Sequence, residues 1–482
     1  MAVSERSVNW RAIMASDLEP FFNPKTVAVV GASARKTSVG GVIFRNFLKP
    51  AFKGAVYPIN PRATDVLDVP SYERVSLVPD PIDLTVIAVP AGIVPNIMKD
   101  CEEKGVRAVI IISGGFREIG AEGAYLEEQV VDIAKRGGIR IIGPNCVGIY
   151  DTNTGVDTTF LPASRMGRPG KGYISFISQS GAFAAAVLDM NAQSGLGVSR
   201  VVSFGNKADV NEIDLIQYLG NDPETHVIVE YLEGLTPSTG SSYLQTAKVV
   251  TQKKPIIVVK AGRSQRGSTA AASHTGALAG DARLYDFAFH QAGILPAQDF
   301  EDGFEMAKSL ASQPPAKGNR VLIVTDAGGA GVMTVDACEA LGLIVPEPPE
   351  KEKQILRESF PSYCSVHNPI DLTGDTDAGR YQLAFDLLLG TSHYDAAIAI
   401  VMMQVPLLNL DIVDRLVAVV RKYKKPMIAL TAGGRFTMQG ARLLEERGIP
   451  AFPTPARAAK ALWALVEYGQ HIRKFHLQNP PT

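Results

Sequence analysis

The sequence predicts an α/β protein whose parallel sheets carry helices on both faces. Along most of its 482 residues, a short apolar run is followed by a glycine-rich turn and then by a helical stretch. The clearest apolar runs lie at 27–33, 84–90, 108–115, 140–145, 173–181, 255–262, 319–331, 397–403 and 426–434. Near-continuous apolar strands that alternate with helices are typical of parallel sheets buried on both faces. Ligands bind to such folds at the carboxyl ends of the strands.

The length predicts about three domains, at roughly 150 residues each. Two segments divide the chain. Residues 151–172 show little apolar periodicity and many turn formers, and residues 312–319 form a connector of Pro, Gly and Lys. We therefore expect domains at 1–150, 151–312 and 313–482.

The second and third of these segments resemble each other. The stretch KKPIIVVKAGR at 253–263 recurs as KKPMIALTAGGR at 424–435, and 173–189 parallels 319–337. Two motifs that recur in the same order predict a shared architecture, although generic α/β strands can also look alike. We expect a Rossmann-like first domain, followed by two flavodoxin-like, doubly wound domains of common descent.

Composition narrows the class of protein. With 46% hydrophobic and 20% charged residues the chain is typical of soluble globular proteins. A net charge of −1 provides no basic field for nucleic acid or an anionic membrane. No apolar stretch reaches the roughly 18 residues of a spanning helix, and the N-terminus is too polar for a secretory signal. The cysteines are scattered, which argues against a zinc site or a disulfide framework and for the cytoplasm; they are Cys101, Cys146, Cys338 and Cys364.

The first glycine turn, at 27–41, predicts a nucleotide-phosphate site. Gly31 follows a strand, and Gly40–Gly41 open a helix whose amides and dipole suit a pyrophosphate. NAD binding would place a carboxylate at the end of the next strand, which ends instead in Asn60–Pro61. A carboxylate there would repel the 3′-phosphate of coenzyme A (CoA), so the turn favours CoA over NAD; a turn without a ligand is the alternative. The residues we assign to CoA are Gly31, Ser33, Arg35, Lys36, Asn60, Pro61, Val89 and Pro90.

Two more turns predict a phosphoryl site. Each joins a strand to a helix through small residues, at 177–182 and 326–331. Tight packing alone would explain either turn. Two equivalent helix N-termini in related domains could also converge on one anion. The residues we assign to phosphate are Ser178, Ser180, Gly181, Ala182, Gly329, Ala330 and Gly331.

His274 is the candidate phosphoryl carrier. It lies in SHTGALAGD at 273–281, among small and polar residues that cannot bury it in a large apolar core. A neutral imidazole in a loop that moves can accept a phosphoryl group and pass it on. An exposed histidine without a role is the alternative reading. The other six histidines lack such surroundings, and we interpret them as structural or surface residues.

Glu233 is the candidate acid that orients this imidazole. The strand at 227–232 runs into Glu233–Gly234, at the end of the sheet where ligands bind. Glu230 lies further back, where we expect packing or a salt bridge. A solvated loop acid is the alternative for Glu233.

Taken together, these stretches resemble the α subunit of ADP-forming acetyl-CoA synthetase, in the succinyl-CoA synthetase superfamily. The resemblance covers nearly the whole chain. The motifs that carry it are GAS (31–33), YPINP (57–61), SGGF (113–116), GPNCVG (143–148), ISQSGA (177–182), SFGNKADV (203–210), YLEG (231–234), SHTGALAGD (273–281), DAGGAG (326–331) and NPIDLTGD (368–375).

The resemblance implies an enzyme. It places CoA on residues 1–150, the phosphoryl group on His274, and the stabilising carboxylate on Glu233. Acyl-CoA and phosphate would give an acyl phosphate and CoA, the acyl phosphate would phosphorylate His274, and ADP would take the phosphoryl group to give ATP. A non-catalytic, CoA-binding regulatory protein of the same descent is the alternative, and an NAD-dependent dehydrogenase is a more distant one.

The resemblance also implies a partner. The family binds Mg²⁺ and ATP or ADP on an ATP-grasp unit, and all three expected domains are already assigned to other roles. We therefore expect a separate ATP-grasp β subunit in an α2β2 heterotetramer, a small carboxylic acid as substrate, and no metal held by this chain.

Overall fold

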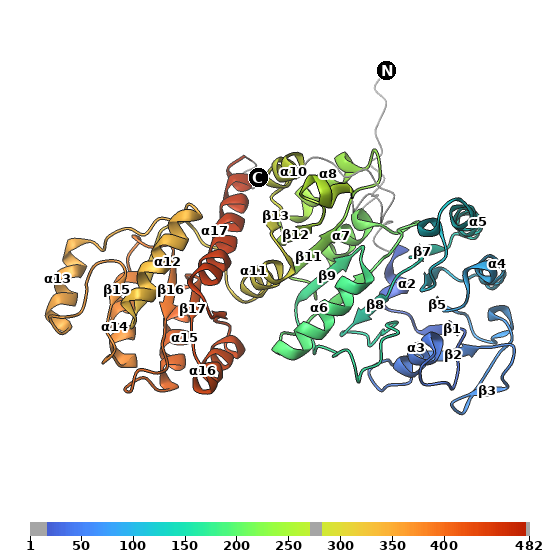
Figure 1. The fold of residues 1–482 in the computed structure, drawn as a ribbon, viewed down its shortest axis with the longest axis horizontal. Coiled ribbons are helices and arrows are strands. Elements are labelled where there is room, and N and C mark those ends of the chain that lie inside the picture. Colours follow the sequence, from blue (N-terminus) through green and yellow to red (C-terminus); the bar gives the residue numbers. More distant parts are fainter. Residues whose placement is uncertain (1–16, 270–281, 479–482) are drawn as a thin grey trace, which may run out of the picture. The chain divides into compact units, whose positions relative to one another are not determined.

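The computed structural model describes residues 17–269 and 282–478, in two compact units, Met1–Pro296 and Ala297–Thr482. The first unit holds two large sheets and the second unit holds one (Figure 1). In each large sheet, the first parallel strand along the chain lies between the next two, which is the 2-1-3-4-5 order of flavodoxin-like folds. The α/β architecture expected from the alternating pattern is confirmed.

The first sheet has the order β2-β1-β5-β6-β7 and is parallel throughout. Its strands are β1 (Thr26–Val30), β2 (Ala55–Ile59), β5 (Leu84–Ile87), β6 (Ala108–Ile111) and β7 (Arg140–Ile142), and a short hairpin pairs β3 (Asp65–Val66) with β4 (Val69–Pro70). The α-helices are α2 (Glu19–Phe22), α3 (Val39–Phe47), α4 (Val94–Lys104) and α5 (Ala121–Gly137). Single 3₁₀ turns lie at η1 (Val75–Leu77), η2 (Ala91–Ile93) and η3 (Arg117–Ile119). Alternate residues of β1 pack into two hydrophobic clusters, one on each face of the sheet.

The second sheet has the order β13-β12-β11-β9-β10-β8. Its strands are β8 (Gly148–Asp151), β9 (Ile174–Ser178), β10 (Arg200–Ser203), β11 (Val227–Leu232), β12 (Ile256–Lys260) and β13 (Leu295–Ala297). Strand β8 is antiparallel to β10, whereas β9 to β12 pair in parallel. The helices are α6 (Gly181–Ser194), α7 (Glu212–Asn221), α8 (Gly240–Val250) and α10 (Ala282–Ala292).

One hydrophobic cluster runs from the first sheet into the second. It contains Val86 and Ile110 of the first sheet together with Ile177 and Ile228 of the second. Phe22 of α2 stacks on Tyr218 of α7 with ring centroids 4.4 Å apart. The two sheets of the first unit therefore share a core.

The second unit contains the third sheet, in the order β15-β14-β16-β17-β18. Its strands are β14 (Val321–Thr325), β15 (Ile370–Asp371), β16 (Ala396–Ile400), β17 (Met427–Leu430) and β18 (Ala451–Phe452), all parallel. The helices are α11 (Phe300–Ser312), α12 (Gly328–Ala340), α13 (Glu350–Ser359), α14 (Ala378–Leu389), α15 (Asp411–Tyr423), α16 (Arg435–Glu446) and α17 (Pro455–Gln478). One face of the sheet packs against α14 and α15, and the other against α17.

The predicted connectors coincide with breaks between elements. Residues 152–173 join β8 to β9, and 313–320 join α11 to β14. Helix α11 belongs to the second compact unit, although the expected boundary at 312 would group it with the second sheet. Within residues 17–269 and 282–478, none of the helices is both long and apolar enough to cross a membrane.

Candidate active site at the carboxyl edge of the second sheet

The turn after β11 places Glu233 at the carboxyl edge of the second sheet. Gln179, the first residue after the neighbouring strand β9, holds this turn. Its Oε1 accepts hydrogen bonds from the backbone N–H of Glu233 at 2.7 Å and of Gly234 at 3.1 Å. Its Nε2 donates to the carbonyl oxygen of Gly234 at 2.8 Å. The main chain that carries the predicted acid is thus fixed by one neutral amide.

Two lysines hold the same turn, one at the end of β12 and one in the loop between β10 and α7. Lys260, the last residue of β12, is 4% exposed and donates to the carbonyl oxygen of Glu233 at 2.8 Å. Burial lowers the pKa of Lys260, and its ammonium lies 4.7 Å from the ring centroid of Tyr285. Lys207 donates to the carbonyl oxygen of Gly234 at 2.8 Å and pairs with Glu212 at 3.0 Å. Both carbonyls of the turn therefore point at cations.

The Glu233 side chain is 8% exposed and interacts with Tyr231. Burial raises the pKa of Tyr231, and the charge of the Glu233 carboxylate and a hydrogen bond to it add to the effect. The Tyr231 ring stacks on Phe183, in the first turn of α6, with centroids 4.4 Å apart. This chain of contacts ties the acid to the start of α6.

Glu230 lies in the core, as the sequence led us to expect. It is 0% exposed and accepts a hydrogen bond from the Tyr243 hydroxyl at 2.5 Å. Its other carboxylate oxygen has no partner among the described residues. Burial raises the pKa of Glu230 to about 8, so it is mostly protonated at neutral pH. Glu230 is therefore a packing residue, not part of a salt bridge.

The start of α6 has the small-residue geometry predicted for a phosphate site. The Ser178 hydroxyl accepts from the Ser180 N–H at 3.0 Å and donates to the Ser180 carbonyl at 2.7 Å. The Ser180 hydroxyl caps the helix by accepting from the Phe183 N–H at 3.3 Å. Gly181 and Ala182 are the first two helical residues, whose amides have no intrahelical partner. The Ser178 hydroxyl donates within the turn, whereas the Ser180 hydroxyl only accepts, so the amides and the Ser180 O–H are the donors left for an anion.

The start of α12, in the second unit, repeats this turn with one difference. The Thr325 hydroxyl accepts from the Ala327 N–H and donates to its carbonyl, both at 3.0 Å. Ala327 occupies the capping position and offers no side-chain cap. The Asp371 carboxylate lies beside this helix start, since a Cβ on Gly328 would meet its Oδ2 at 2.6 Å. The predicted residues Gly329, Ala330 and Gly331 follow within the first turn.

The first glycine turn brings the predicted CoA residues to the ends of β1, β2 and β5. Gly31 has φ +88°, and a Cβ on it would meet the Ala88 carbonyl at 2.6 Å and Val89 Cγ1 at 3.0 Å. Only glycine fits there. The Asn60 amide donates to the Ala32 carbonyl at 2.9 Å and accepts from the Arg62 N–H at 2.9 Å. Asn60 therefore braces the turn with both ends of its side chain.

The remaining predicted CoA residues surround this turn. Arg35, Lys36, Pro61 and Pro90 are exposed, and Ser33 is half-buried. The Ser33 hydroxyl accepts from the Arg35 N–H at 3.1 Å. Helix α3 starts at Val39, so Gly40 and Gly41 lie in its first turn as predicted.

Several residues of these sites were missed by the sequence analysis. Gln179 lies inside the motif ISQSGA, yet its partners are 54 and 55 positions away. Lys260 ends a strand that looked purely structural. Arg45 donates to the carbonyl oxygens of Gly41 at 2.8 Å and Arg35 at 3.3 Å, which braces the first glycine turn. The sequence did contain a signal for Lys260. In the repeat of 253–263 as 424–435, the position of Lys260 is occupied by Thr431.

His274, the predicted phosphoryl carrier, lies outside the described residues. The chain reaches it from Lys260, at the end of β12, and continues from it into α10. Among residues 17–269 and 282–478, no group of three or more His, Cys, Asp or Glu side chains could hold a metal ion.

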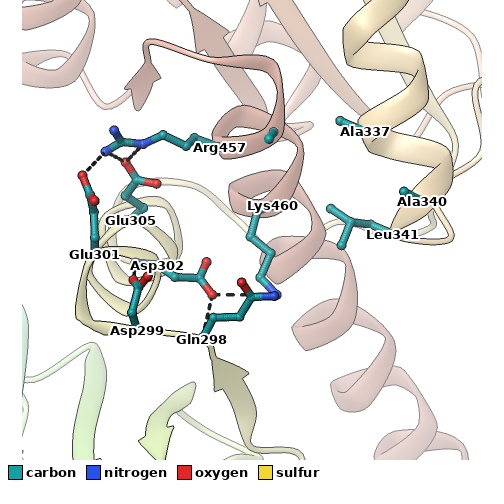
Figure 2. A pocket seen from close by; sticks show the side chains of 11 residues that line it. Gln298, Asp299, Glu301, Asp302, Glu305, Ala337, Ala340, Leu341, Arg457 and Lys460 are labelled. Atoms are coloured by element: carbon teal, nitrogen blue, oxygen red, sulfur yellow. Dashed lines mark hydrogen bonds and ion pairs between the residues drawn. The ribbon is translucent and has the colours of Figure 1, made fainter.

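A cavity of about 380 Å³ lies among α11, α12 and α17 of the second unit (Figure 2). Most of its charged residues pair with one another. Arg457 contacts Glu301 at 3.0 Å and also Glu305, and Lys460 lies 3.9 Å from Asp302. None of the predicted site residues lines this cavity, so we do not assign the reaction to it.

Three family models match successive parts of the chain. The CoA binding domain matches residues 25–152, the succinyl-CoA ligase like flavodoxin domain 171–310, and the ligase-CoA domain 321–471. The three ranges follow the three large sheets, except that β8 of the second sheet falls within the CoA binding domain match.

Characterised relatives match over nearly the full length. The chain is 39% identical over 463 residues to the α subunit of ADP-forming acetate–CoA ligase I of Pyrococcus furiosus, covering 94% of this chain and 98% of that subunit. It is 38% identical to ADP-forming acetate–CoA ligase I of Archaeoglobus fulgidus, of which it spans 64%. A solved structure of Ca. Korarchaeum cryptofilum dinucleotide forming acetyl-coenzyme A synthetase 1, in complex with phosphate and ADP, matches with a TM-score of 0.89 and 37% identity, covering 96% of this chain and 99% of that one. The chain therefore belongs to the ADP-forming acetate–CoA ligase family, within the succinyl-CoA synthetase superfamily, and corresponds to its α subunit.

Proposed function

We propose that this chain is the CoA-binding, phosphoryl-carrying subunit of an acyl-CoA synthetase that interconverts acyl-CoA, ADP and phosphate with a carboxylic acid, CoA and ATP. The observation that carries the proposal is the Glu233 turn. It holds the main chain of Glu233 against Gln179, two residues before α6, and against Lys260 at the end of β12, from which the chain leads to His274. The relatives are ligases by name, which supports an enzyme over a non-catalytic regulatory protein.

In the first step, a phosphate oxygen attacks the thioester carbonyl, the C–S bond breaks, and CoA leaves as its thiol. The N–H groups of Gly181 and Ala182 at the start of α6 are the donors that would hold the phosphate, because a helix N-terminus favours an anion. Gly329, Ala330 and Gly331 at the start of α12 remain a separate candidate for holding a phosphate, within the second unit. The Asp371 carboxylate beside that helix start opposes an anion there.

In the second step, the neutral imidazole of His274 attacks the phosphorus of the acyl phosphate, and the carboxylic acid leaves as its carboxylate. Glu233 accepts a hydrogen bond from the other ring nitrogen and stabilises the cationic phosphoimidazole. Glu230 is too deeply buried for this role. In the third step, ADP attacks the phosphohistidine, which gives ATP and returns the imidazole.

The CoA site uses the first glycine turn. Gly31 lets the main chain approach a pyrophosphate, and Asn60 keeps the turn in shape. We assign the 3′-phosphate to Arg35 and Lys36, whose exposed side chains support this assignment. A charge-assisted contact of this kind contributes on the order of 1.5–3 kcal/mol.

Calorimetry should therefore show that dephospho-CoA binds about tenfold to a hundredfold more weakly than CoA. Equal affinities would show that the 3′-phosphate lies in solvent. Tighter binding of NAD than of CoA would contradict the assignment of the whole turn.

The nucleotide site belongs to a partner in this proposal. One relative is named as a subunit, and another is a longer single chain of which this chain spans 64%. A separate ATP-grasp β subunit would supply the Mg²⁺–nucleotide site, in an α2β2 heterotetramer. Three domains at 1–150, 151–312 and 313–482 fit the ranges of the family models. All four cysteines are free thiols, which supports a reducing cytoplasm.

The test is phosphorylation of His274. Incubation with acetyl-CoA and ³²P-phosphate should give an acid-labile, base-stable adduct on the peptide that contains residues 273–281. His274→Ala should abolish the adduct and the synthesis of acyl-CoA from acetate, CoA and ATP by the complex with the β subunit. Full labelling and turnover of His274→Ala would refute the phosphohistidine.

A further inference from the structure

We propose that Gln179 is the positioning residue for the Glu233 carboxylate, and that an amide is required there because it must both accept and donate. The inference rests on the proposed role of Glu233. It starts from three hydrogen bonds of the Gln179 side chain. They hold the N–H groups of Glu233 and Gly234 and the carbonyl oxygen of Gly234.

The second unit contains the same arrangement with different chemistry. In the first unit Ser178 of β9 pairs in register with Tyr231 of β11, and in the second Thr325 of β14 pairs with Ile400 of β16. Counting on from these pairs, Gln179 corresponds to Asp326 and Glu233 to Met402. The correspondence is also visible in the contacts, because the Met402 N–H donates to both oxygens of Asp326, at 3.1 and 2.9 Å.

In both sheets, the residue that follows the first parallel strand therefore holds the turn after the neighbouring strand. It does so whether or not that turn carries an acid. Where the turn carries Met402, an acid holds it, and burial raises the pKa of Asp326 to about 7. Where the turn carries Glu233, a neutral amide holds it. A second carboxylate at 179 would repel Glu233 and favour its protonation, which would remove the charge that stabilises a phosphoimidazole.

The donor half of the amide also matters. A carboxylate could still accept from the N–H groups of Glu233 and Gly234, but it could not donate to the Gly234 carbonyl. Among the described residues, Lys207 would then be the remaining side-chain donor to that oxygen. Because these hydrogen bonds fix the main chain of Glu233 and Gly234, the Glu233 carboxylate can move only by rotation about its own side-chain bonds. Catalysis depends steeply on such preorganisation.

A double-mutant cycle tests the coupling. Gln179→Ala should lower kcat and the level of phosphoenzyme formed from acetyl-CoA and ³²P-phosphate by about tenfold, the scale of one or two lost hydrogen bonds, with KM for CoA unchanged. In the Glu233→Gln background, Gln179→Ala should lower kcat and the phosphoenzyme level by less than about twofold. The reason is that the group that Gln179 positions has already lost its charge.

Gln179→Glu is the matched, nearly isosteric variant. Once protonated, its carboxyl group can donate and accept as the amide does. Its activity relative to the wild type should therefore recover as the pH falls from 8 towards 6, a dependence that a purely structural role would not produce. Thermal unfolding of each variant shows whether it is folded; if Gln179→Ala is not, the pH profile of Gln179→Glu decides the matter.

The outcomes separate the two hypotheses. Gln179 does not act through Glu233 if Gln179→Ala lowers kcat by the same factor in the wild type and in Glu233→Gln. The same conclusion follows if Gln179→Glu shows the wild-type pH profile. If Glu233→Gln itself forms phosphoenzyme and turns over like the wild type, the proposed role of Glu233 fails instead.

Discussion

The second and third sheets are two versions of one scaffold, and only one of them carries the predicted acid. Both have the strand order 2-1-3-4-5, and both open their first helix with a hydroxyl that closes the same small turn, Ser178 in one and Thr325 in the other. The residues at matching places differ where chemistry is proposed. The strand registers match Glu233 to Met402 and Lys260 to Thr431, and the sequence repeat also matches the second pair. The fold is thus compatible with either set of residues, and the proposed reaction would depend on a few side chains at one edge.

The largest expected effect tests this contrast directly. Glu233→Gln keeps the size of the side chain and removes its charge, so kcat should fall by roughly 10²–10³, the scale of one preorganised electrostatic contact. Met402→Gln, at the matching place in the second unit, should change kcat by less than about twofold. Met402 is half-exposed and carries no charge, and substitutions at such positions usually have little effect. Steady-state kinetics of the reconstituted complex measure both. Similar losses in the two variants would show that both turns take part.

A smaller effect concerns the buried acid behind the turn. Glu230 has a counterpart, Ala399, that cannot titrate. Because burial raises the pKa of Glu230 to about 8, from about 4.3 in the unfolded chain, the folded protein retains a proton that the unfolded chain releases between these values. Its contribution to the free energy of unfolding therefore falls as the pH rises through this window.

Glu230→Gln should remove that dependence. The free energy of unfolding of the variant should match that of the wild type near pH 5 and exceed it at pH 8. The difference between the two should stop growing above the folded-state pKa of Glu230. Urea unfolding at pH 5, 6.5 and 8 gives the difference directly. Parallel curves for the two proteins would mean that Glu230 titrates normally.

The smallest effect compares neighbouring glycines at the start of α12. A Cβ on Gly329 would meet nothing within 4 Å, and the matching residue of α6 is already Ala182. Gly329→Ala should raise the free energy of unfolding by about 0.5 kcal/mol, because alanine is the better helix former. Gly328→Ala should instead lower it by about 1 kcal/mol, because its Cβ would meet Asp371 Oδ2 at 2.6 Å. Equal midpoints of urea unfolding would place Asp371 away from this helix start.

The sequence predicted the elements better than the contacts between them. Apolar runs such as 84–90 and 397–403 locate buried strands because strand burial is a local property of the residues. Gly31 was assigned to a turn correctly, since its positive φ and its close approach to the Ala88 carbonyl exclude other residues. The placement of Glu233 at the sheet edge followed from strand polarity alone.

What the sequence could not give were bonds between distant positions. Gln179 looks like a filler between two serines until β11 is placed beside β9. Asn60 was assigned to the ligand, whereas the structure shows that its amide also holds the turn, which depends on the distance to the Ala32 carbonyl. The Asp371 carboxylate beside Gly328 likewise depends on the pairing of β15 with β14.

The shared core of the first unit limits how this protein can be divided or recombined. Because one hydrophobic cluster includes side chains from both of its sheets, and α2 is anchored on α7, the first two sheets should melt in a single cooperative transition. A CoA domain excised at residue 150 would leave Val86, Ile110 and Phe22 without part of their packing and would be prone to aggregate. Exchange of CoA domains between relatives would therefore have to move both sheets together, so a swap of the proposed CoA site would also carry the proposed phosphoryl site.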